Sequence, residues 1–215
     1  VQSSALTIKE QSQRITTIVQ ELLNFARSKT PQRAPVDLNR LLEETIKLLR
    51  PMADKHHVTI DFHPWGNEAT TELDSAQMQQ VFSNLLVNAV HATQAGAKSK
   101  LNNDAGSEQA PQRIEISIDR QRSVEIDPSR FTAEQTDLAE SYWRVTVADF
   151  GVGIGPDVLD NIFEPFFTTK DVGEGTGLGL SIAYGIVREH AGWIGVESQV
   201  GRGSQFTVFL PAQSH

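Results

Sequence analysis

Two glycine-rich runs in the second half of the chain have the composition of loops that approach a ligand. Residues 149–155 read DFGVGIG and residues 173–180 read GEGTGLGL. Glycine permits positive φ and lets a backbone come close to a bound molecule. The first run begins with the carboxylate of Asp149, and the second leads into residues 181–187, whose apolar residues have helical spacing. A glycine-rich loop that opens a helix presents free N–H groups and the positive end of the helix dipole to an anion. We therefore expect one carboxylate that selects a base and one loop that holds phosphates.

The glycines could instead serve only as turn residues, and a single Gly-x-Gly would favour that simpler interpretation. Here two different glycine-rich runs flank an aromatic-proline run, residues 163–170, which reads FEPFFTTK. Neither is a Walker loop, because no Gly-Lys-Ser/Thr follows, and neither is a good dinucleotide fingerprint, because no strand directly precedes Gly175. Three distinct runs in this order favour a functional site over simple turns.

A predicted helix over residues 75–94 carries polar side chains inside an otherwise apolar run. Gln80, Asn84, Asn88 and His91 follow one another at spacings of four, four and three residues, which places them on one helical face. Asparagine is mildly unfavourable in the middle of a helix, and a single one usually faces solvent. Two aligned Asn residues beside small residues indicate a site that faces something polar. An Asn amide oxygen is a suitable hard ligand for Mg²⁺, which takes its other ligands from water and phosphates.

The composition is that of an ordinary globular protein of 215 residues, with 39% hydrophobic and 21% charged residues. The absence of cysteine argues against a disulfide scaffold and against a cysteine-ligated zinc site. A net charge of −8 gives no support to nucleic-acid binding, which needs a basic face. No apolar run has the length of a membrane span and no signal peptide is evident, so we expect no membrane contact by this chain and a cytoplasmic location. Because the chain begins at Val1 without Met, we expect a piece of a larger protein, which could carry a membrane anchor elsewhere.

Apolar periodicity and turn residues divide the chain into three segments. Residues 1–30 are predicted to form an amphipathic helix that needs a partner, residues 31–37 a proline-containing linker, and residues 38–215 a domain of mixed helices and strands. Within that domain, residues 96–112 and 121–141 have the composition of long surface loops. The elements expected in the domain are helices over 38–52, 75–94, 156–162 and 180–190, and strands over 58–62, 69–73, 114–118, 143–148, 193–198 and 204–210.

Taken together, the motifs resemble those of the catalytic ATP-binding domain of sensor histidine kinases, over about residues 36–211. The matching motifs are NLLVNA at 84–89 (the N box), DFGVGI at 149–154 (the first Gly box), FEPFF at 163–167 (the F box), GTGLGL at 175–180 (the second Gly box) and GRGSQF at 201–206 (the last glycine motif). Residues 8–29 resemble the second helix of the dimerisation hairpin that carries the phosphoacceptor in this family. Residues 168–170, Thr-Thr-Lys, resemble the lid of the nitrogen-regulatory branch.

The resemblance implies a Bergerat-type ATP-binding fold with ATP and Mg²⁺ as cofactors. This fold is an α/β (α+β) two-layer sandwich in which a mixed, mostly antiparallel sheet is covered on one face by helices, here preceded by an N-terminal helix. Asp149 would accept the adenine amino group, because a carboxylate accepts from an exocyclic N–H and rejects the carbonyl of guanine. By the same resemblance, the catalytic residues are Asn84, Asn88 and Lys170, with Asn88 as the metal ligand. The nucleotide contacts implied are Asn84, Asn88, His91, Asp149, Gly151, Gly153, Ile154, Phe163, Thr169, Lys170, Gly175, Thr176, Gly177, Leu178, Gly179, Leu180 and Ser204.

Two of these residues, His91 and Ser204, are predicted on separate grounds. His91 stands one turn beyond Asn88, where the family often has Lys or Arg, which suggests contact with a phosphate. Ser204 shares strand parity with Phe206, so we expect it to face inward. There it either contacts a water on the adenine or is an ordinary hydrogen-bonded strand serine, and the sequence favours neither.

The sequence departs from the family because the acceptor box, a His followed by an acidic residue, is absent. None of its six histidines has that setting. The resemblance therefore implies transfer of the γ-phosphoryl of ATP to a histidine outside this chain, for relay to a response-regulator aspartate. The partners implied are a second copy of the parent protein, through the N-terminal hairpin, and a response-regulator receiver domain. Two alternatives stay open: an ATPase of the same fold, which would have a Glu where Asn84 stands, and a non-catalytic nucleotide-binding or dimerisation module.

Overall fold

The computed structural model describes residues 31–103, 112–123, 139–170 and 175–212, without the side chains of residues 98–103. The expected N-terminal helix over 1–30 lies outside the described residues. So do residues 104–111 and 124–138 of the two expected loops, and residues 171–174 between the F box and the second Gly box.

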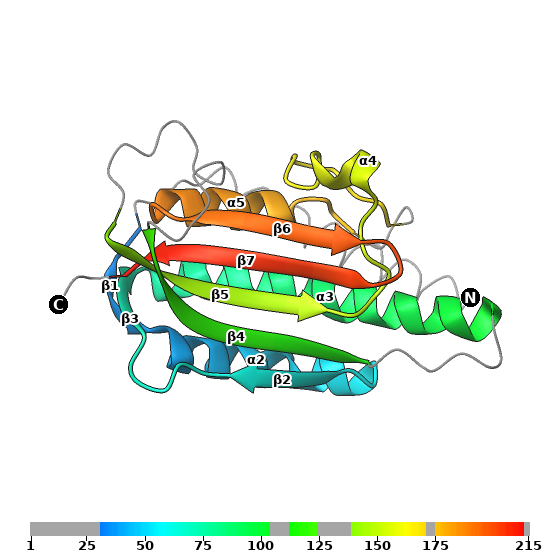
Figure 1. Ribbon diagram of the computed structural model, residues 1–215, viewed down its shortest axis with the longest axis horizontal. Coiled ribbons are helices and arrows are strands. Elements are labelled where there is room, and N and C mark those ends of the chain that lie inside the picture. Colours follow the sequence, from blue (N-terminus) through cyan, green and yellow to red (C-terminus); the bar gives the residue numbers. More distant parts are fainter. Residues whose placement is uncertain (1–30, 104–111, 124–138, 171–174, 213–215) are drawn as a thin grey trace, which may run out of the picture.

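A five-stranded sheet forms one layer of the fold, as Figure 1 shows. Its strands lie in the order β2-β4-β5-β7-β6, with β2 parallel to β4 and every other neighbour antiparallel. The mixed, mostly antiparallel sheet predicted from the sequence is therefore confirmed. The strand bounds are β2 Thr59–His63, β4 Arg113–Arg122, β5 Ser141–Asp149, β6 Trp193–Gln199 and β7 Gly203–Pro211.

Helices cover one face of this sheet (Figure 1). Helices α2 (Leu38–Lys55), α3 (Ser75–Asn103) and α5 (Gly179–Glu189) bury apolar residues against the inward-facing residues of β4, β5 and β7. Phe82 of α3 and Val145 of β5 are both fully buried in this core. The two-layer sandwich is thus the expected one. None of the helices in the described ranges combines the length and the apolar character that a bilayer crossing needs.

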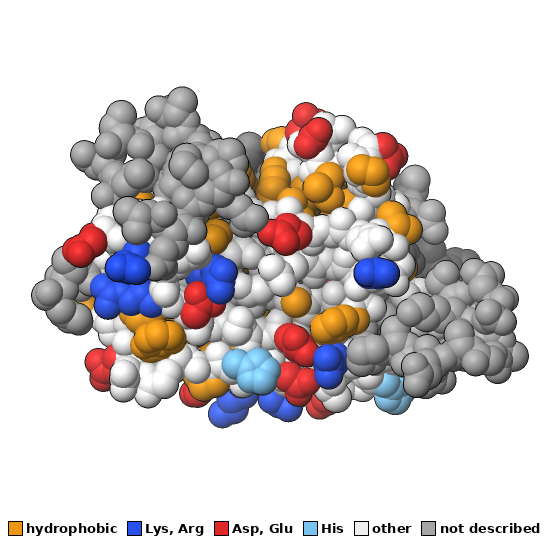
Figure 2. Space-filling view, in the orientation of Figure 1, with side chains coloured by type: hydrophobic (Ala, Val, Ile, Leu, Met, Phe, Trp, Pro, Cys, Tyr) orange, Lys and Arg blue, Asp and Glu red, His pale blue; other side chains and the backbone are white. Residues whose placement is uncertain are grey.

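The other face of the sheet carries charged side chains, which Figure 2 shows between polar residues. Arg144 of β5 donates to Asp119 of β4 at 2.9 Å, and Arg113 pairs with Glu115 at 2.8 Å. A strand with one apolar and one charged face has apolar and polar residues that alternate along its sequence, which is why β4 could be predicted from its pattern.

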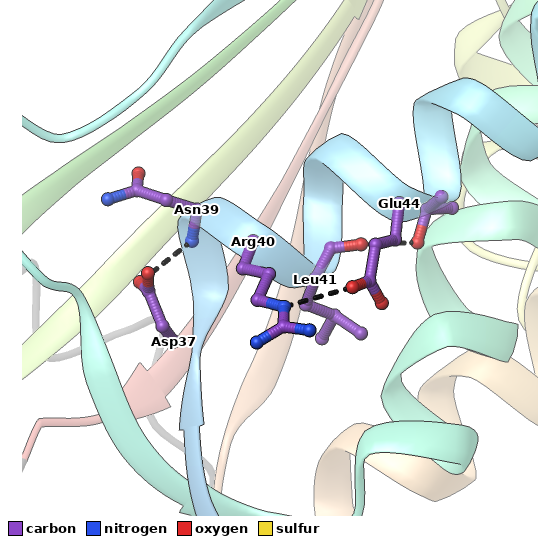
Figure 3. A network of polar contacts seen from close by, with 6 residues as sticks. Asp37, Asn39, Arg40, Leu41 and Glu44 are labelled. Carbon is purple, nitrogen blue, oxygen red and sulfur yellow. Dashed lines mark hydrogen bonds and ion pairs between the residues drawn. The ribbon is translucent and has the colours of Figure 1, made fainter.

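The expected linker over 31–37 is shorter than predicted, because its second half is a strand. Strand β1 (Ala34–Asp37) pairs antiparallel with β3 (Thr70–Leu73) in a separate two-stranded sheet. Val36 packs against the core, so this segment is anchored to the domain. Asp37 then caps α2: its carboxylate accepts from the backbone N–H of Asn39 at 3.1 Å (Figure 3).

Helix α3 is longer than predicted, and it includes the first part of the expected loop 96–112. The helix runs through Gly96 to Asn103. Gly96 does not end the helix, because it lies against Gly151, where a Cβ on Gly96 would be 3.1 Å from the Gly151 backbone. The expected loop 121–141 is shorter as well, since β4 and β5 pair as far as Arg122 and Ser141. Helix α4 (Pro156–Leu159) ends before the predicted residue 162.

Two glycines, Gly185 in α5 and Gly192 in the turn between α5 and β6, should respond in opposite ways to the same substitution. A Cβ on Gly192 would lie 2.2 Å from the Phe209 carbonyl oxygen, whereas a Cβ on the exposed Gly185 would meet nothing within 4 Å. We expect Gly192→Ala to lower the free energy of unfolding by about 1–3 kcal/mol. Gly185→Ala should raise it by about 0.5–1 kcal/mol, because alanine restricts the unfolded chain and favours helix.

Urea denaturation followed by circular dichroism measures both changes. Equal stability of Gly192→Ala and the wild type would contradict the close approach of the α5–β6 turn to β7.

Candidate functional site

A cavity of about 1100 Å³ opens beside α3, between the ends of β5 and β7 and the two glycine-rich runs. Most of the residues predicted for the site line it, although they come from separate parts of the sequence. Those that do are Asn84, Asn88, His91, Asp149, Gly153, Ile154, Thr169, Lys170, Gly175, Thr176, Gly177, Gly179, Leu180 and Ser204.

One end of the cavity is built around Asp149 at the C-terminal end of β5. Its side chain is buried, and its Oδ1 accepts from the Gly151 N–H at 2.9 Å. Burial raises the pKa of the Asp149 carboxyl to about 6, although hydrogen bonds from Gly151 and Ser204 oppose the rise. The walls beside it are apolar, with Ile154, Ile162 and Phe206. A buried acceptor in an apolar wall suits an N–H donor on a flat ligand.

Ser204 faces inward, as its strand parity predicted. It lies opposite Asp149 in the β5–β7 register and donates to the Asp149 carboxylate. Its Oγ is also 2.9 Å from the Oγ of Ser198, which accepts from the Ile154 N–H at 2.7 Å. The chain Asp149–Ser204–Ser198–Ile154 thus ties the first Gly box to the hairpin β6–β7. Ser198 was not predicted as a site residue, because in the sequence it looks like an ordinary strand serine.

Gly151 does not line the cavity, but it allows the loop after β5 to contact helix α3. A Cβ at this position would lie 2.3 Å from the Ala92 carbonyl oxygen of α3. The same oxygen accepts from the Val152 N–H at 3.2 Å. Gly153 has a φ of +70° and would place a Cβ 2.1 Å from the Gln199 oxygen. Only glycine satisfies both positions without displacing backbone.

The other end of the cavity is polar and is formed by the helical face that the N box predicted. Asn84 donates from Nδ2 to the carbonyl oxygen of Gly179 at 2.9 Å, and therefore holds the start of α5. Lys170 donates from Nζ to Asn88 Oδ1 at 3.4 Å and lies 3.0 Å from His91 Nδ1. Because an ammonium has no lone pair, His91 must accept at Nδ1.

His91 is neutral in this arrangement. Burial, the positive charge of Lys170 and the neighbouring His56 together lower the pKa of its imidazole to about 4. His56 also lines the cavity, with its ring in edge-to-face contact with His91. It caps the C-terminus of α2, and no local motif marks it as a site residue.

The second Gly box opens α5 toward the cavity. Gly177 has a φ of +68°, and a Cβ there would lie 2.4 Å from the Phe166 carbonyl carbon. The N-cap position, Leu178, makes no side-chain capping hydrogen bond. Leu178 does not line the cavity, because it is fully buried in the core. The first N–H groups of α5 are thus placed to meet an anion.

Two of the three aromatic rings of the F box pack on the domain. Phe163 packs 5.4 Å from the Tyr184 ring and does not line the cavity, and Phe167 packs against the core. Phe166 does not dock: its side chain is 62% exposed and its φ is +68°. The left-handed turn at Phe166 brings its backbone against Gly177 and directs its ring outward.

A protein-family model matches most of this chain. The model for histidine kinase-, DNA gyrase B-, and HSP90-like ATPases matches residues 73–214. Sensor kinase CckA of Brucella abortus (strain 2308) is 35% identical over 209 residues, which are 96% of this chain and 20% of that protein. Sensor histidine kinase ZraS of Escherichia coli (strain K12) is 31% identical over 207 residues, or 96% of this chain and 37% of that protein. The chain thus spans well under half the length of these two relatives.

Solved structures share the fold. Full-length ShkA in complex with AMPPNP aligns with a TM-score of 0.72 at 24% identity, over 100% of this chain and 39% of that one. The catalytic domain of histidine kinase ThkA aligns with a TM-score of 0.61 at 28% identity, over 84% of this chain and 96% of that one. This chain therefore belongs to the histidine kinase-, DNA gyrase B- and HSP90-like ATPases, as an ATP-binding domain of the sensor histidine kinase type.

Proposed function

We propose that this chain binds Mg-ATP in the cavity and transfers the γ-phosphoryl group to a histidine outside the chain, as the catalytic part of a two-component sensor histidine kinase. One observation carries the proposal: a single cavity has a buried carboxylate at one end and, at the other, Asn88, Lys170 and the uncapped start of α5. A molecule with an N–H donor at one end and phosphates at the other fits both ends.

The polar end suits Mg²⁺ on the evidence of its donor set. Asn88 Oδ1 already faces a cation, the ammonium of Lys170, at 3.4 Å. An amide oxygen in this setting is an appropriate ligand for Mg²⁺, which would neutralise phosphate charge during the transfer. Asn88 would hold the ion, and Lys170 would then be available to contact the γ-phosphate.

The protein's own contribution to the transfer is mainly positioning. Phosphoryl transfer needs little covalent help from the enzyme, and its transition state is stabilised by aligned donors and cations. Asn84 fixes the carbonyl of Gly179 and so the direction of the first N–H groups of α5. The nucleophile is the nitrogen of the acceptor histidine.

The partners in this proposal are a second copy of the parent protein, through a hairpin that includes residues 1–30, and a response-regulator receiver domain. Histidine kinase ThkA was solved in complex with response regulator TrrA, and aligns with a TM-score of 0.67 at 26% identity. The alignment covers 96% of this chain and 49% of that one. The sequence of residues 168–170 supports the nitrogen-regulatory branch. A cytoplasmic location completes the proposal.

A self-contained ATPase of the same fold is the second candidate, and the structure gives a reason against it. Hydrolysis requires a base that activates water, one helical turn before the metal ligand. That position holds Asn84, whose amide is engaged with Gly179 and which cannot accept a proton at neutral pH.

Nucleotide choice tests the role of Asp149. ATP and ADP should bind and GTP should not, because the carboxylate accepts from an adenine N–H. Asp149→Asn should weaken ADP binding by about tenfold or more, since a donor replaces one acceptor oxygen. Asp160→Asn, an exposed change outside the cavity, should leave the affinity unchanged.

Isothermal titration calorimetry measures these affinities. Equal affinities for the wild type and Asp149→Asn would remove Asp149 from the base-binding site.

Asn88→Ala should reduce phosphoryl transfer by at least about a hundredfold while ADP affinity falls less than about tenfold. The metal matters most when the triphosphate is being transferred, so an intact ADP site can remain. Gln79→Ala, on the same helix but outside the cavity, is the matched control. Radiolabel transfer to a supplied acceptor hairpin gives the rate, and wild-type transfer by Asn88→Ala would show that Asn88 is only a helix residue.

The chain by itself should bind ATP without forming a stable phosphohistidine, because none of its six histidines has the acceptor setting. Extension toward the N-terminus of the parent should restore labelling at a new histidine. The measurement is acid-labile, base-stable label mapped by mass spectrometry. Label on any of the present histidines would show that the acceptor was misplaced, and absence of label after extension would favour the non-catalytic module.

A further inference from the structure

A second polar cluster lies at the opposite end of the helix layer from the cavity. It joins the segment before β1, the start of α3 and the end of α5, which Figure 1 shows near the β1–β3 sheet. Its members are Gln32, Arg33, Asp74, Glu189 and His190. None of them lines the cavity, and the proposed reaction does not use them.

The Asp74 carboxylate binds both the start of α3 and the segment before β1. Its Oδ1 accepts from the N–H groups of Ala76 and Gln77 at 3.1 Å, which caps α3, and its Oδ2 accepts from the Gln32 N–H at 2.9 Å. Burial raises the pKa of Asp74, but the hydrogen bonds from the N–H groups of Gln77, Gln32 and Ala76 outweigh it and leave the pKa below its ordinary value, so the carboxylate stays ionised.

His190 connects the end of α5 to Asp74. Its ring is 3% exposed, and its Nε2 accepts from the Asp74 N–H at 3.0 Å. Its Nδ1 is 2.8 Å from the Ile186 carbonyl oxygen and must donate to it. This pair of bonds requires the neutral Nδ1–H tautomer. A proton on Nε2 would face the Asp74 N–H and break the contact. Arg33 donates from Nη2 to the Glu189 carbonyl oxygen at the same helix end.

Helix α5 is therefore tied to the first part of α3 at both of its own ends. At the cavity, Asn84 donates to Gly179, the first residue of α5, at 2.9 Å. At the far end, the Asp74 N–H donates to His190 at 3.0 Å. The two helices pack together between these ties and close a ring. Because packed helices move as rigid bodies, a shift at one tie must be accommodated at the other.

We propose that the contact between Asp74 and His190 is a joint that couples the segment preceding β1 to the nucleotide site. Gln32 is bound to Asp74 and Arg33 to the end of α5, so a displacement of this segment acts on both helices. The proposal rests on the proposed function, since it assigns regulation to the same site. By reciprocity, nucleotide binding must change the joint as much as the joint changes nucleotide affinity.

The joint opens in acid. The pKa of His190 is lowered from 6.5, first by burial and then by the charge of Arg33, while the bond to Ile186 and the carboxylates of Asp74 and Glu189 oppose the change. The folded domain therefore favours neutral His190. The closed joint loses its acceptor when the pH falls through this lowered pKa, and its contribution to stability begins to decline below 6.5, where the unfolded chain takes up the proton.

An NMR titration of the wild-type chain tests the coupling. The pKa of His190 is measured from its ring signals without nucleotide and with saturating ADP and Mg²⁺. We expect ADP to lower it by about half a unit, which corresponds to about threefold tighter ADP binding to the closed joint. The negative phosphates would by themselves raise the pKa. Their direct effect is small, because an 11-residue α5 spans about 16 Å and the Debye length is about 8 Å at physiological salt.

The sign of the shift therefore decides the outcome. A lowered pKa supports the joint, and an unchanged or raised pKa overturns it. Exposed His63 on β2 is the internal control and should not shift. If calorimetry shows no ADP binding, the proposed function and the joint both fail; if ADP binds and His190 does not respond, only the joint fails.

A substitution in the segment preceding β1 tests the same coupling. Arg33→Met removes the guanidinium bond to the end of α5 and should weaken ADP binding about threefold. It should also reduce the ADP-dependent slowing of hydrogen exchange at the Gln32 and Asp74 amides. Arg40→Met, which loses only an exposed pair with Glu44, is the matched control. Identical ADP affinity and exchange in Arg33→Met and Arg40→Met would contradict the joint.

Discussion

The close contact between α3 and the loop after β5 sets the geometry of the whole site. The Ala92 carbonyl oxygen of α3 accepts from the Val152 N–H, and a Cβ on Gly151 would lie 2.3 Å from that oxygen. Asn84, Asn88 and His91 lie on the same helix, so this one backbone contact fixes their distance from Asp149. A side chain at Gly151 would separate the two ends of the cavity from each other.

Electrostatics then divide the cavity into two unlike ends. At one end burial raises the pKa of Asp149 to about 6, so at neutral pH the carboxylate is ionised and seeks donors. At the other end the ammonium of Lys170 lies between an amide oxygen and a neutral imidazole. Both of these acceptors are uncharged, and a phosphate oxygen would bind the ammonium more strongly than either of them.

The sequence could predict the parts of the fold and site that depend on local signals. Glycine positions, Asn spacing and strand alternation fix residues close together in the chain, and the cavity gathers most of them. Contacts over long sequence separations could not be predicted. Ala34 pairs with Leu73, His190 accepts from an N–H 116 residues away, and His56 reaches the cavity only because α2 packs beside α3. The helix predicted over 75–94 was too short, because the contact of Gly96 with Gly151 is invisible in the sequence.

The helix termini show how stability and binding are divided in this domain. Asp37 caps α2 and Asp74 caps α3, so both helices satisfy N-terminal N–H groups with a carboxylate. In α5 the N-cap residue, Leu178, makes no side-chain capping bond, and Thr176 Oγ1 accepts only from the Leu178 N–H at 3.3 Å. This is the helix whose start opens on the cavity. A missing cap costs about 0.5–2 kcal/mol. An anionic ligand there would supply the absent acceptor and stabilise α5. Because α5 ends at His190, a ligand that completes the first turn of this helix also steadies the contact that anchors the segment before β1.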